Sequence, residues 1–280
     1  MTETIRTWLI TGCSTGLGRA LAELVIAKGE RVFATARKPE ELQDLVADHQ
    51  NARALKLDVT APADITAAVA EVERAGGVDV LVNNAGYGYL TAIEEGDEEG
   101  YRAQFETNMF GLIAMTKAVL PEMRRRASGH IVNIASVGGL VGNPGSGYYA
   151  ATKFGVVGLS EALSKEVGAL GIRVTVVEPG PFRTDWAGRS LQSSARSIDA
   201  YADTVHARLK QLNAYSGRQP GDPRRAAEAI VTVVNDANPP LNLVLGAPGL
   251  KMAREKLAAL GAELDKWEAV TLGADYPDQR

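Results

Sequence analysis

The sequence is poor in cysteine and histidine. Among its 280 residues there is one cysteine, Cys13, and there are three histidines, His49, His130 and His206. A single cysteine cannot form an internal disulfide, and the histidines lack the spacing of a zinc site. We therefore expect neither an internal disulfide nor a bound metal, so any chemistry must come from other side chains.

Long apolar runs and an excess of positive charge are also missing. The longest apolar runs have strand length, and residues 1–7 lack the apolar core of a signal peptide, so we expect no membrane span and a cytoplasmic protein. A formal net charge of −4 offers no basic surface for nucleic acid. With 45% hydrophobic and 23% charged residues, the chain can form one α/β domain over residues 1–280 with a continuous core.

Short apolar segments alternate with segments of helical character along the chain. Seven of them read as buried strands, at residues 8–10, 31–35, 54–57, 80–82, 131–134, 174–177 and 243–245. This alternation predicts a doubly wound Rossmann-type α/β fold, in which about seven parallel strands are flanked by helices. Five residues fall just after predicted strands and should meet in one cleft at the carboxyl edge of the sheet: Gly12, Asp58, Asn83, Ser136 and Pro179.

A glycine-rich turn, TGCSTGLG at residues 11–18, joins the first predicted strand to a helix. A pyrophosphate can approach the amides of a helix start only where no Cβ intervenes, which gives Gly12, Gly16 and Gly18 a reason to lack side chains. The spacing is GxxxGxG rather than GxGxxG. Alone, such a turn is also compatible with a tight connection that binds no ligand.

The ordered set of motifs resembles the short-chain dehydrogenase/reductase family. The resemblance spans residues 7 to about 185 and rests on TGCSTGLG at 11–18, Asp58-Val59, Asn83-Asn84-Ala85-Gly86, Asn108, Ser136, YAATK at 149–153 and Pro179-Gly180. It implies a dinucleotide site formed by Gly12, Ser14, Thr15, Gly16, Leu17, Gly18, Asp58, Val59, Asn84, Ala85, Gly86, Tyr149, Lys153, Pro179, Gly180 and Thr184. The alternative for residues 83–86 is a structural role, in which their amides cross-link strands by hydrogen bonds.

Tyr149 and Lys153 are four residues apart, so on a helix they share one face. The ammonium group can favour the phenolate, and we expect it to lower the pKa of Tyr149 and so create an acid or base for the oxygen of a carbonyl substrate. Ser136 could donate a hydrogen bond to the same oxygen as a stabiliser, not as a nucleophile. The resemblance adds that Lys153 holds the nicotinamide ribose and that Asn108 supports a water-linked proton relay. The alternatives are that Ser136 caps a strand end and that Asn108 is a structural amide bending its helix.

The choice of cofactor depends on the end of the second predicted strand. Arg37 and Lys38 follow Ala36 there, and no carboxylate is present to accept hydrogen bonds from a ribose. Two cations suit a 2′-phosphate, so we expect NADP(H), with NAD(H) as the alternative. The opposing interpretation is that Arg37 is an ordinary solvated residue. Asp58 resembles the family's adenine-contacting aspartate, and its alternative is a helix cap before Pro62.

Two segments lie outside the common motifs. Residues 182–220 are long for a connection and contain the apolar side chains of Trp186, Tyr201, Leu209, Leu212 and Tyr215, so we interpret them as a substrate lid, or else as a small packed helical hairpin. Residues 247–280 form a C-terminal extension with a helical stretch around residues 251–260, which either covers the cleft or modifies an oligomer face. The resemblance implies a homodimer or homotetramer that associates through helices at residues 101–125 and 148–169.

We therefore expect an NADP(H)-dependent oxidoreductase that interconverts a secondary alcohol and a ketone or aldehyde by hydride transfer. Tyr149 is the expected general acid or base, and the substrate is expected to be bulky and apolar. The alternative from another class is a regulator that senses a dinucleotide without turnover, although such a protein has no need of Asn108, Ser136, Tyr149 and Lys153 together. An epimerase or dehydratase would need a larger C-terminal substrate domain. No residue in the lid identifies the natural substrate.

Overall fold

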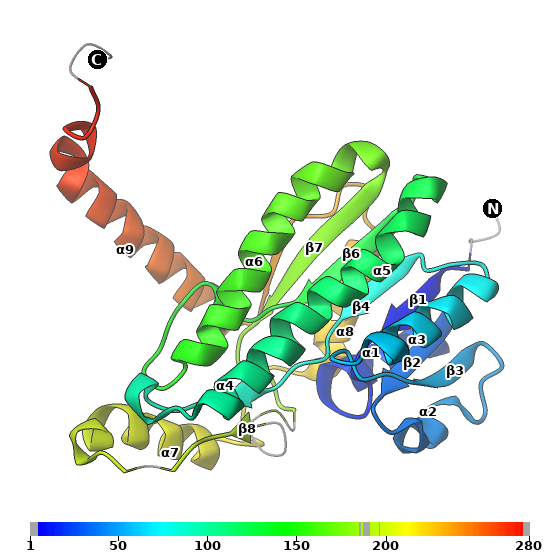
Figure 1. The fold of residues 1–280 in the computed structure, drawn as a ribbon, viewed down its shortest axis with the longest axis horizontal. Helices are drawn as coiled ribbons and strands as arrows, with labels where there is room; N and C mark the ends of the chain where they lie inside the picture. Colours follow the sequence, from blue (N-terminus) through cyan, green and yellow to red (C-terminus); the bar gives the residue numbers. More distant parts are fainter. Residues whose placement is uncertain (1–4, 185, 187–190, 196, 277–280) are drawn as a thin grey trace.

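The structure, a computed structural model, describes residues 5–184, 186, 191–195 and 197–276. Within them, one sheet contains seven parallel strands in the order β3-β2-β1-β4-β6-β7-β9 (Figure 1). These strands are β1 (Thr7–Ile10), β2 (Arg31–Ala36), β3 (Ala52–Lys56), β4 (Val80–Asn83), β6 (Gly129–Ile134), β7 (Ile172–Pro179) and β9 (Asn242–Leu245). Each overlaps a predicted strand, so the prediction of a doubly wound α/β fold with seven parallel strands is confirmed.

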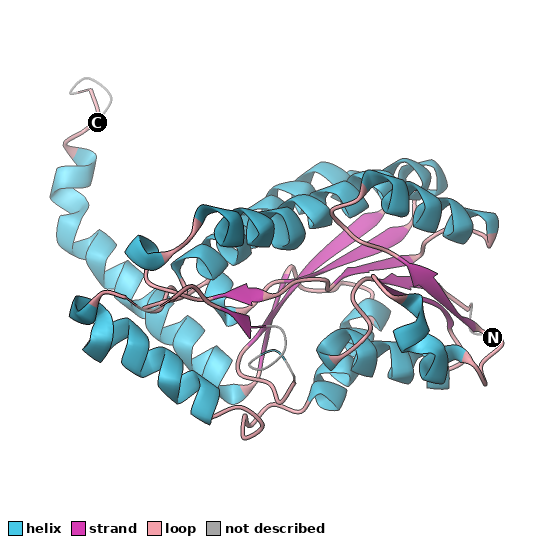
Figure 2. Cartoon of the chain, turned by 60° about the horizontal axis from the view of Figure 1, so that its bottom comes forward, coloured by secondary structure: helices cyan, strands magenta, loops and turns pink. Residues whose placement is uncertain are grey.

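Helices cover both faces of the sheet (Figures 1 and 2). On one face lie α1 (Gly16–Ala27), α2 (Gln43–Val46) and α8 (Pro223–Asn235), and on the other lie α3 (Pro62–Arg74), α5 (Gly111–Arg126) and α6 (Gly147–Val167). Successive side chains of β1 lie on opposite faces of the sheet. Trp8 and Ile10 pack with the first group of helices, and Leu9 packs with the second. Both faces of β1 are therefore buried, which explains its uninterrupted apolar sequence.

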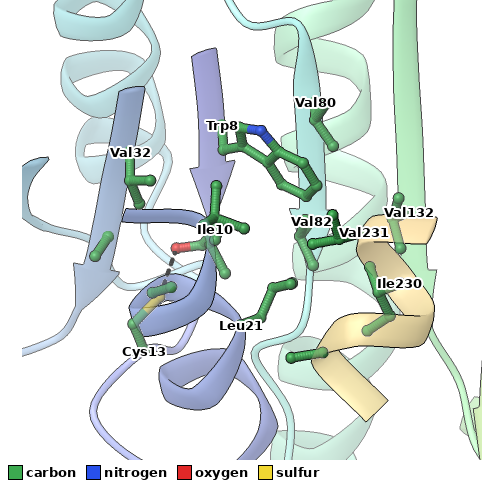
Figure 3. Close-up of a cluster of buried hydrophobic side chains, with 14 of the residues drawn as sticks. Trp8, Ile10, Cys13, Leu21, Val32, Val80, Val82, Val132, Ile230 and Val231 are labelled. Atoms are coloured by element: carbon green, nitrogen blue, oxygen red, sulfur yellow. Dashed lines mark hydrogen bonds between the residues drawn. The ribbon is translucent and has the colours of Figure 1, made fainter. Parts of the chain in front are cut away.

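The core between the sheet and the first group of helices is shown in Figure 3. Trp8 and Ile10 of β1 lie beside Leu21 of α1 and Ile230 of α8, and each of the four is at most 1% exposed. Burying a side chain of this size stabilises the fold by about 1.5–3 kcal/mol. This packing fixes the start of α1 relative to the end of β1, where the glycine turn lies.

The helix expected at residues 101–125 is interrupted. It consists of α4 (Glu98–Phe105), a π-helical segment η3 (Glu106–Phe110) and α5. A π-helical turn inserts one extra residue into the helix, and such turns are frequent at functional sites. Asn108, the predicted relay residue, lies in the middle of this segment.

The charged segment after β2, which has helical character in the sequence, forms only short helical turns. The chain forms a 3₁₀ turn, η1 (Pro39–Leu42), and then the single-turn helix α2. Leu42 and Leu45 are the buried apolar residues of this stretch. With so few apolar anchors, a longer helix would have little to pack against the sheet.

The predicted lid leaves and rejoins the domain at one point. Phe182 and Gly221 form an isolated parallel bridge, in which Arg183 N donates to Gly221 O at 2.8 Å. Between them the described elements are β8 (Leu191–Gln192), η7 (Asp199–Tyr201), η8 (Ala202–His206) and α7 (Ala207–Ala214). β8 pairs with β5 (Gly88–Tyr89), so the lid is attached to the segment after β4. Residues 185, 187–190 and 196 of the predicted lid lie outside the described residues.

The C-terminal extension contains one long helix, α9 (Ala247–Leu272), instead of the short helical stretch expected at residues 251–260. It points away from the sheet (Figures 1 and 2). Residues 277–280 lie outside the described residues. Among the helices that the structure describes, α9 included, none combines the length and apolar character needed to cross a membrane.

Candidate active site

The glycine turn lies between β1 and α1 at the carboxyl edge of the sheet. Gly12 and Gly16 have φ of 71° and 63°, a left-handed conformation that glycine adopts without strain. A Cβ on Gly18 would collide with Asn84, and a Cβ on Gly16 would lie 3.6 Å from Cβ of Thr184. No side chain of the described residues caps the start of α1, and its first turn holds no acidic residue. The turn therefore leaves amide groups available to an anionic ligand.

Asn84 links the glycine turn to the segment after β4. Its Nδ2 donates to Thr11 O and Gly12 O, each at 2.9 Å, and Thr11 Oγ1 accepts from the backbone N–H groups of Asn84 and Ala85. Asn83 Nδ2 in turn donates to Asn133 Oδ1 at 2.9 Å. The cross-linking alternative thus describes the contacts of Asn83 and Asn84 well. Thr11 was not named as a site residue from the sequence. It accepts the hydrogen bonds from Asn84 and Ala85 that hold the segment after β4 against the glycine turn.

The remaining predicted cofactor residues surround this turn. Arg37 and Lys38 are exposed at the end of β2, and the charge of Arg37 acts on the Tyr87 hydroxyl, whose pKa burial raises and Arg37 lowers. Asp58 Oδ1 accepts from Thr60 N at 2.9 Å. Asp58 is therefore not the N-cap of α3, a position that Ala61 holds. Gly86 is exposed, and the other predicted residues are half-buried or buried: Ser14, Thr15, Leu17, Val59, Ala85, Pro179, Gly180 and Thr184.

Asn108 is buried and its amide pairs with the backbone of Tyr87. Asn108 Nδ2 donates to Tyr87 O at 2.8 Å, and Asn108 Oδ1 accepts from Tyr87 N at 3.0 Å. The same Nδ2 lies 3.4 Å from Thr152 Oγ1 on α6. The π-helical turn thus directs Asn108 toward both the segment after β4 and α6. Neither residue was named as a site residue from the sequence: Tyr87 follows the motif at residues 83–86 directly, and Thr152 lies within YAATK.

Ser136, Tyr149 and Lys153 meet where β6 ends and α6 passes over it. A Cβ on Gly138 would lie 3.2 Å from Tyr149 Cε1 and 3.4 Å from Ser136 Oγ, so the two side chains flank the same point. Lys153 Nζ is 5.8 Å from the centroid of the Tyr149 ring and donates to Ile134 O at 2.8 Å. Ser136 Oγ also accepts from Gly138 N at 3.0 Å, so it caps the short 3₁₀ turn η4 (Val137–Gly139).

The electrostatics of this group differ from the sequence expectation, which was that Lys153 lowers the pKa of Tyr149. Burial raises the pKa of Tyr149 to about 12, and the Ser136 hydroxyl acts in the opposite direction. Burial also lowers the pKa of Lys153 to about 8. The expectation is wrong for this structure because the desolvation of both groups dominates and because the ammonium donates to Ile134 O.

An apolar cluster from the lid covers Tyr149. The rings of Tyr149 and Trp186 lie 5.2 Å apart with 56° between their planes. Leu90 and Ala92 from the segment after β5 pack with Val205 and Leu209 of the lid in the same cluster. Of the lid residues named from the sequence, Tyr201 and Leu212 join this cluster, whereas Tyr215 is exposed.

Glu95, at the end of the 3₁₀ turn η2 (Ile93–Glu95), holds the lid by several hydrogen bonds. Its carboxylate accepts from Ser197 N at 2.8 Å and Ile198 N at 2.9 Å, and His206 Nε2 lies 2.9 Å from Oε2. The N–H of Ile198 and the imidazole of His206 lower the pKa of this carboxyl to about 2. Glu95 was missed because no sequence motif relates it to residues one hundred positions away.

Comparisons with known proteins agree with this architecture. A family model described as short chain dehydrogenase matches residues 6–195. Oxidoreductase BOA17 of Botryotinia fuckeliana is 40% identical over 270 residues, which are 95% of this chain and 98% of that protein. A crystal structure of a short-chain dehydrogenase from Streptomyces avermitilis, 43% identical, covers 98% of this chain and 100% of its own with a TM-score of 0.92. Serine dehydrogenase complexed with NADP+, 28% identical, covers 85% of this chain and 94% of its own with a TM-score of 0.74.

Glu178 is a buried carboxyl beside this site that the sequence analysis did not single out. It immediately precedes Pro179 in β7 and is 0% exposed. Neither of its carboxyl oxygens has a hydrogen-bond partner among the described residues, and burial raises its pKa to about 7. The neutral form is therefore favoured by folding. The contribution of the neutral Glu178 carboxyl to the free energy of unfolding is fully present below its ordinary pKa of about 4.5. This contribution is lost as pH rises through 7.

We expect Glu178→Gln to stabilise the fold at pH 8, because an amide in the same place carries no charge to desolvate. The free energy of unfolding should rise by about 1–3 kcal/mol at pH 8, with a much smaller gain at pH 5. Urea denaturation at the two pH values measures this difference. Glu166→Gln, at an exposed position, is the control and should give no pH-dependent gain. Equal effects of Glu178→Gln at both pH values would contradict the assignment.

Proposed function

This chain is an oxidoreductase of the short-chain dehydrogenase family, and on that premise we propose that it interconverts a secondary alcohol and a ketone or aldehyde by hydride transfer with NADP(H). The observation that carries the proposal is the meeting of Ser136 and Tyr149 beside Lys153, with Asn108 within reach of the same helix. These groups can deliver a proton and stabilise charge at one oxygen.

In the reductive direction, Tyr149 is the general acid. Its pKa of about 12 keeps the hydroxyl protonated at neutral pH, ready to donate to a carbonyl oxygen that gains charge. Ser136 Oγ, beside the same ring, donates a hydrogen bond to that oxygen. The hydride that reaches the carbonyl carbon is the contribution of the nicotinamide. The products would be the alcohol, the oxidised nicotinamide and, until a proton returns, a tyrosinate.

Lys153 and Asn108 serve the recovery of the proton. The ammonium of Lys153, near the Tyr149 ring, stabilises the tyrosinate by charge. Asn108 holds the backbone of Tyr87 through both atoms of its amide, a geometry that supports its proposed place in a water-linked proton relay to solvent.

The residues at the glycine turn suit a dinucleotide. Gly12 and Gly16 have left-handed backbone, Gly18 leaves no space for a Cβ, and the first amides of α1 lack a side-chain cap among the described residues. Exposed Arg37 and Lys38 at the end of β2 suit the 2′-phosphate of NADP(H). Serine dehydrogenase, the similar structure complexed with NADP+, supports the same choice. NAD(H) is the alternative.

The substrate that fits is bulky and apolar. Trp186, Leu90, Val205 and Leu209 form the apolar surroundings of Tyr149, and they can cover a hydrocarbon or aromatic group attached to the reacting carbonyl. The lid interpretation of residues 182–220 follows from the same contacts. A dinucleotide-sensing regulator is the second candidate, but it gives no reason for a buried Tyr149 and Lys153 at the same point.

The proposal includes a homodimer or homotetramer in the cytoplasm. Phe110 and Phe154, on the helical face that the family resemblance assigns to association, are 50% and 45% exposed. Large apolar side chains on one surface favour a protein contact there.

We expect Tyr149→Phe to lower the rate of NADPH-dependent ketone reduction by about 10²–10⁴-fold, because the variant lacks the proton donor. Absorbance of NADPH with a panel of aliphatic, aromatic and steroid ketones measures the rate. Tyr148→Phe is the matched control: Tyr148 is adjacent but its hydroxyl donates to Ile93 O, so activity should stay within a few-fold of native. If the native chain binds NADPH and reduces no ketone of the panel, the regulator becomes the better explanation.

We expect reduction to slow as pH rises through about 8. The ammonium of Lys153 is present below that pH and is lost above it, whereas Tyr149 stays protonated over the same range. The pH profile of kcat/KM between pH 6 and 9.5 measures the fall. In Lys153→Arg the guanidinium stays charged, so any remaining activity should show no fall near pH 8. A flat native profile would show that the charge of Lys153 is not required.

We expect Arg37→Glu to raise KM for NADPH by roughly 10- to 100-fold, because it replaces a charge-assisted hydrogen bond to the phosphate by repulsion. KM for NADH should change little or fall. Lys28→Glu, at the other end of α1, makes a change of the same charge and should leave both constants near native. A native preference for NADH would overturn the assignment of Arg37.

A further inference from the structure

Most of α9 is exposed. Gly249 and Ala253 are buried where the first turns of the helix pack near β9 and η4. From Arg254 to Tyr276 every residue except Gly261 is exposed. Figures 1 and 2 show this part of the helix extending beyond the edge of the molecule.

The exposed part carries a regular apolar stripe. Leu250, Leu257 and Leu264 are seven residues apart, and Leu260 and Trp267 follow the second and third of them by three residues. This 3–4 spacing is the a/d pattern of a coiled-coil seam. All five side chains are between 41% and 67% exposed. The stripe continues, beyond the domain, the face on which Ala253 packs against the domain.

A helix of this kind needs a second surface. Single helices of about 15 residues are marginal in water, because most helix stability in proteins comes from packing of an apolar face. Gly261 in the interior costs roughly a further 0.5–1 kcal/mol relative to alanine. The stripe must therefore be covered for the helix to persist as the structure shows it.

The charges along the helix indicate what covers it. Lys251, Arg254 and Lys256 against Glu255 give the first half a net charge of +2, and Glu263, Asp265 and Glu268 against Lys266 give the second half −2. The helix is neutral as a whole, which does not suit an anionic membrane surface. Cations near the start of a helix and anions near its end are unfavourable for the helix dipole, so this arrangement of charges does not stabilise an isolated α9. It is complementary to the same helix running in the opposite direction.

We propose that the partner of α9 is α9 of a second copy of this chain, paired antiparallel about a two-fold axis near Leu257 and Leu260. In this register Leu257 faces the second copy's Leu260 and Trp267 faces its Leu250, and Lys256 flanks the seam near its Glu263, two residues from the position directly opposite. A two-fold axis repeats each contact, as in isologous dimers. The stripe exposes on the order of 500 Å² per copy, so pairing removes about 1,000 Å², the lower bound for a specific interface.

The contact is separate from the helical face around Phe110 and Phe154, and it does not depend on the proposed reaction. If both surfaces associate, each should produce a separate increase in the mass of the protein as its concentration rises. The test therefore measures mass in the full chain, with activity only as a check that the variants are folded.

The first experiment compares the native chain with Leu257→Gln/Leu264→Gln by sedimentation velocity over a concentration series. We expect the dissociation constant for the α9-dependent step to rise at least tenfold, so that the mass of the main species falls by half. Ala262→Gln/Ala269→Gln places the same residues on the opposite face of α9 and should keep the native mass. Circular dichroism should show helix loss in the first variant alone. Equal masses for all three chains would overturn the proposal.

The second experiment tests the direction of pairing. Lys256→Glu and Glu263→Lys each place like charges together in an antiparallel pair, so each should weaken association by several-fold at low salt. The double variant Lys256→Glu/Glu263→Lys should restore it. Failure of the double variant to recover would overturn the antiparallel register. Binding of the native chain to vesicles of phosphatidylcholine and phosphatidylglycerol, lost in Leu257→Gln/Leu264→Gln with no difference in mass, would assign the stripe to a membrane and also overturn the proposal.

Discussion

The candidate site depends on the close approach of the glycine turn after β1 to the segment after β4. The strand order reverses between these two strands, so their connections depart to opposite faces and leave open space at the carboxyl edge. Thr11 and Asn84 fix the approach by hydrogen bonds, and Gly18 makes it sterically feasible. The first amides of α1 then point into the opening without a side-chain cap among the described residues. The sequence of the turn is thus a consequence of backbone packing as much as of ligand binding.

Burial determines the chemistry of Tyr149 and Lys153. Desolvation disfavours the charged form of both groups, so it raises the pKa of the phenol to about 12 and lowers that of the amine to about 8. The two values therefore move apart, because burial favours the neutral form of each group, and a proton shift from Tyr149 to Lys153 becomes more costly than in water. The i, i+4 spacing alone suggested a direct charge effect of Lys153 on Tyr149, but it could not show that Ile134 O receives the ammonium.

Local sequence patterns predicted the parts of the structure that repeat regularly. The seven apolar segments define the sheet because a parallel strand buried on both faces needs an uninterrupted apolar run. Motif spacing likewise selected Asn108, Ser136, Tyr149 and Lys153, and the fold brings them to one edge of the sheet. The π-helical turn at Asn108, the burial of Glu178 and the bonds of Glu95 to the lid were not predictable in this way. Each depends on contacts between segments far apart in the sequence, which periodicity does not report.

The lid is attached by two kinds of interaction with different consequences. Its apolar side chains pack on Tyr149 and Leu90, and an apolar ligand can replace those contacts at little cost because they are not directional. The hydrogen bonds from Ser197 and Ile198 to Glu95 are directional. Breaking them would leave a carboxylate whose side chain is 1% exposed with His206 as its remaining partner. In the proposed function, the lid can therefore exchange its apolar contacts with a ligand while Glu95 keeps it on the domain, and the groups proposed to move the proton stay unchanged.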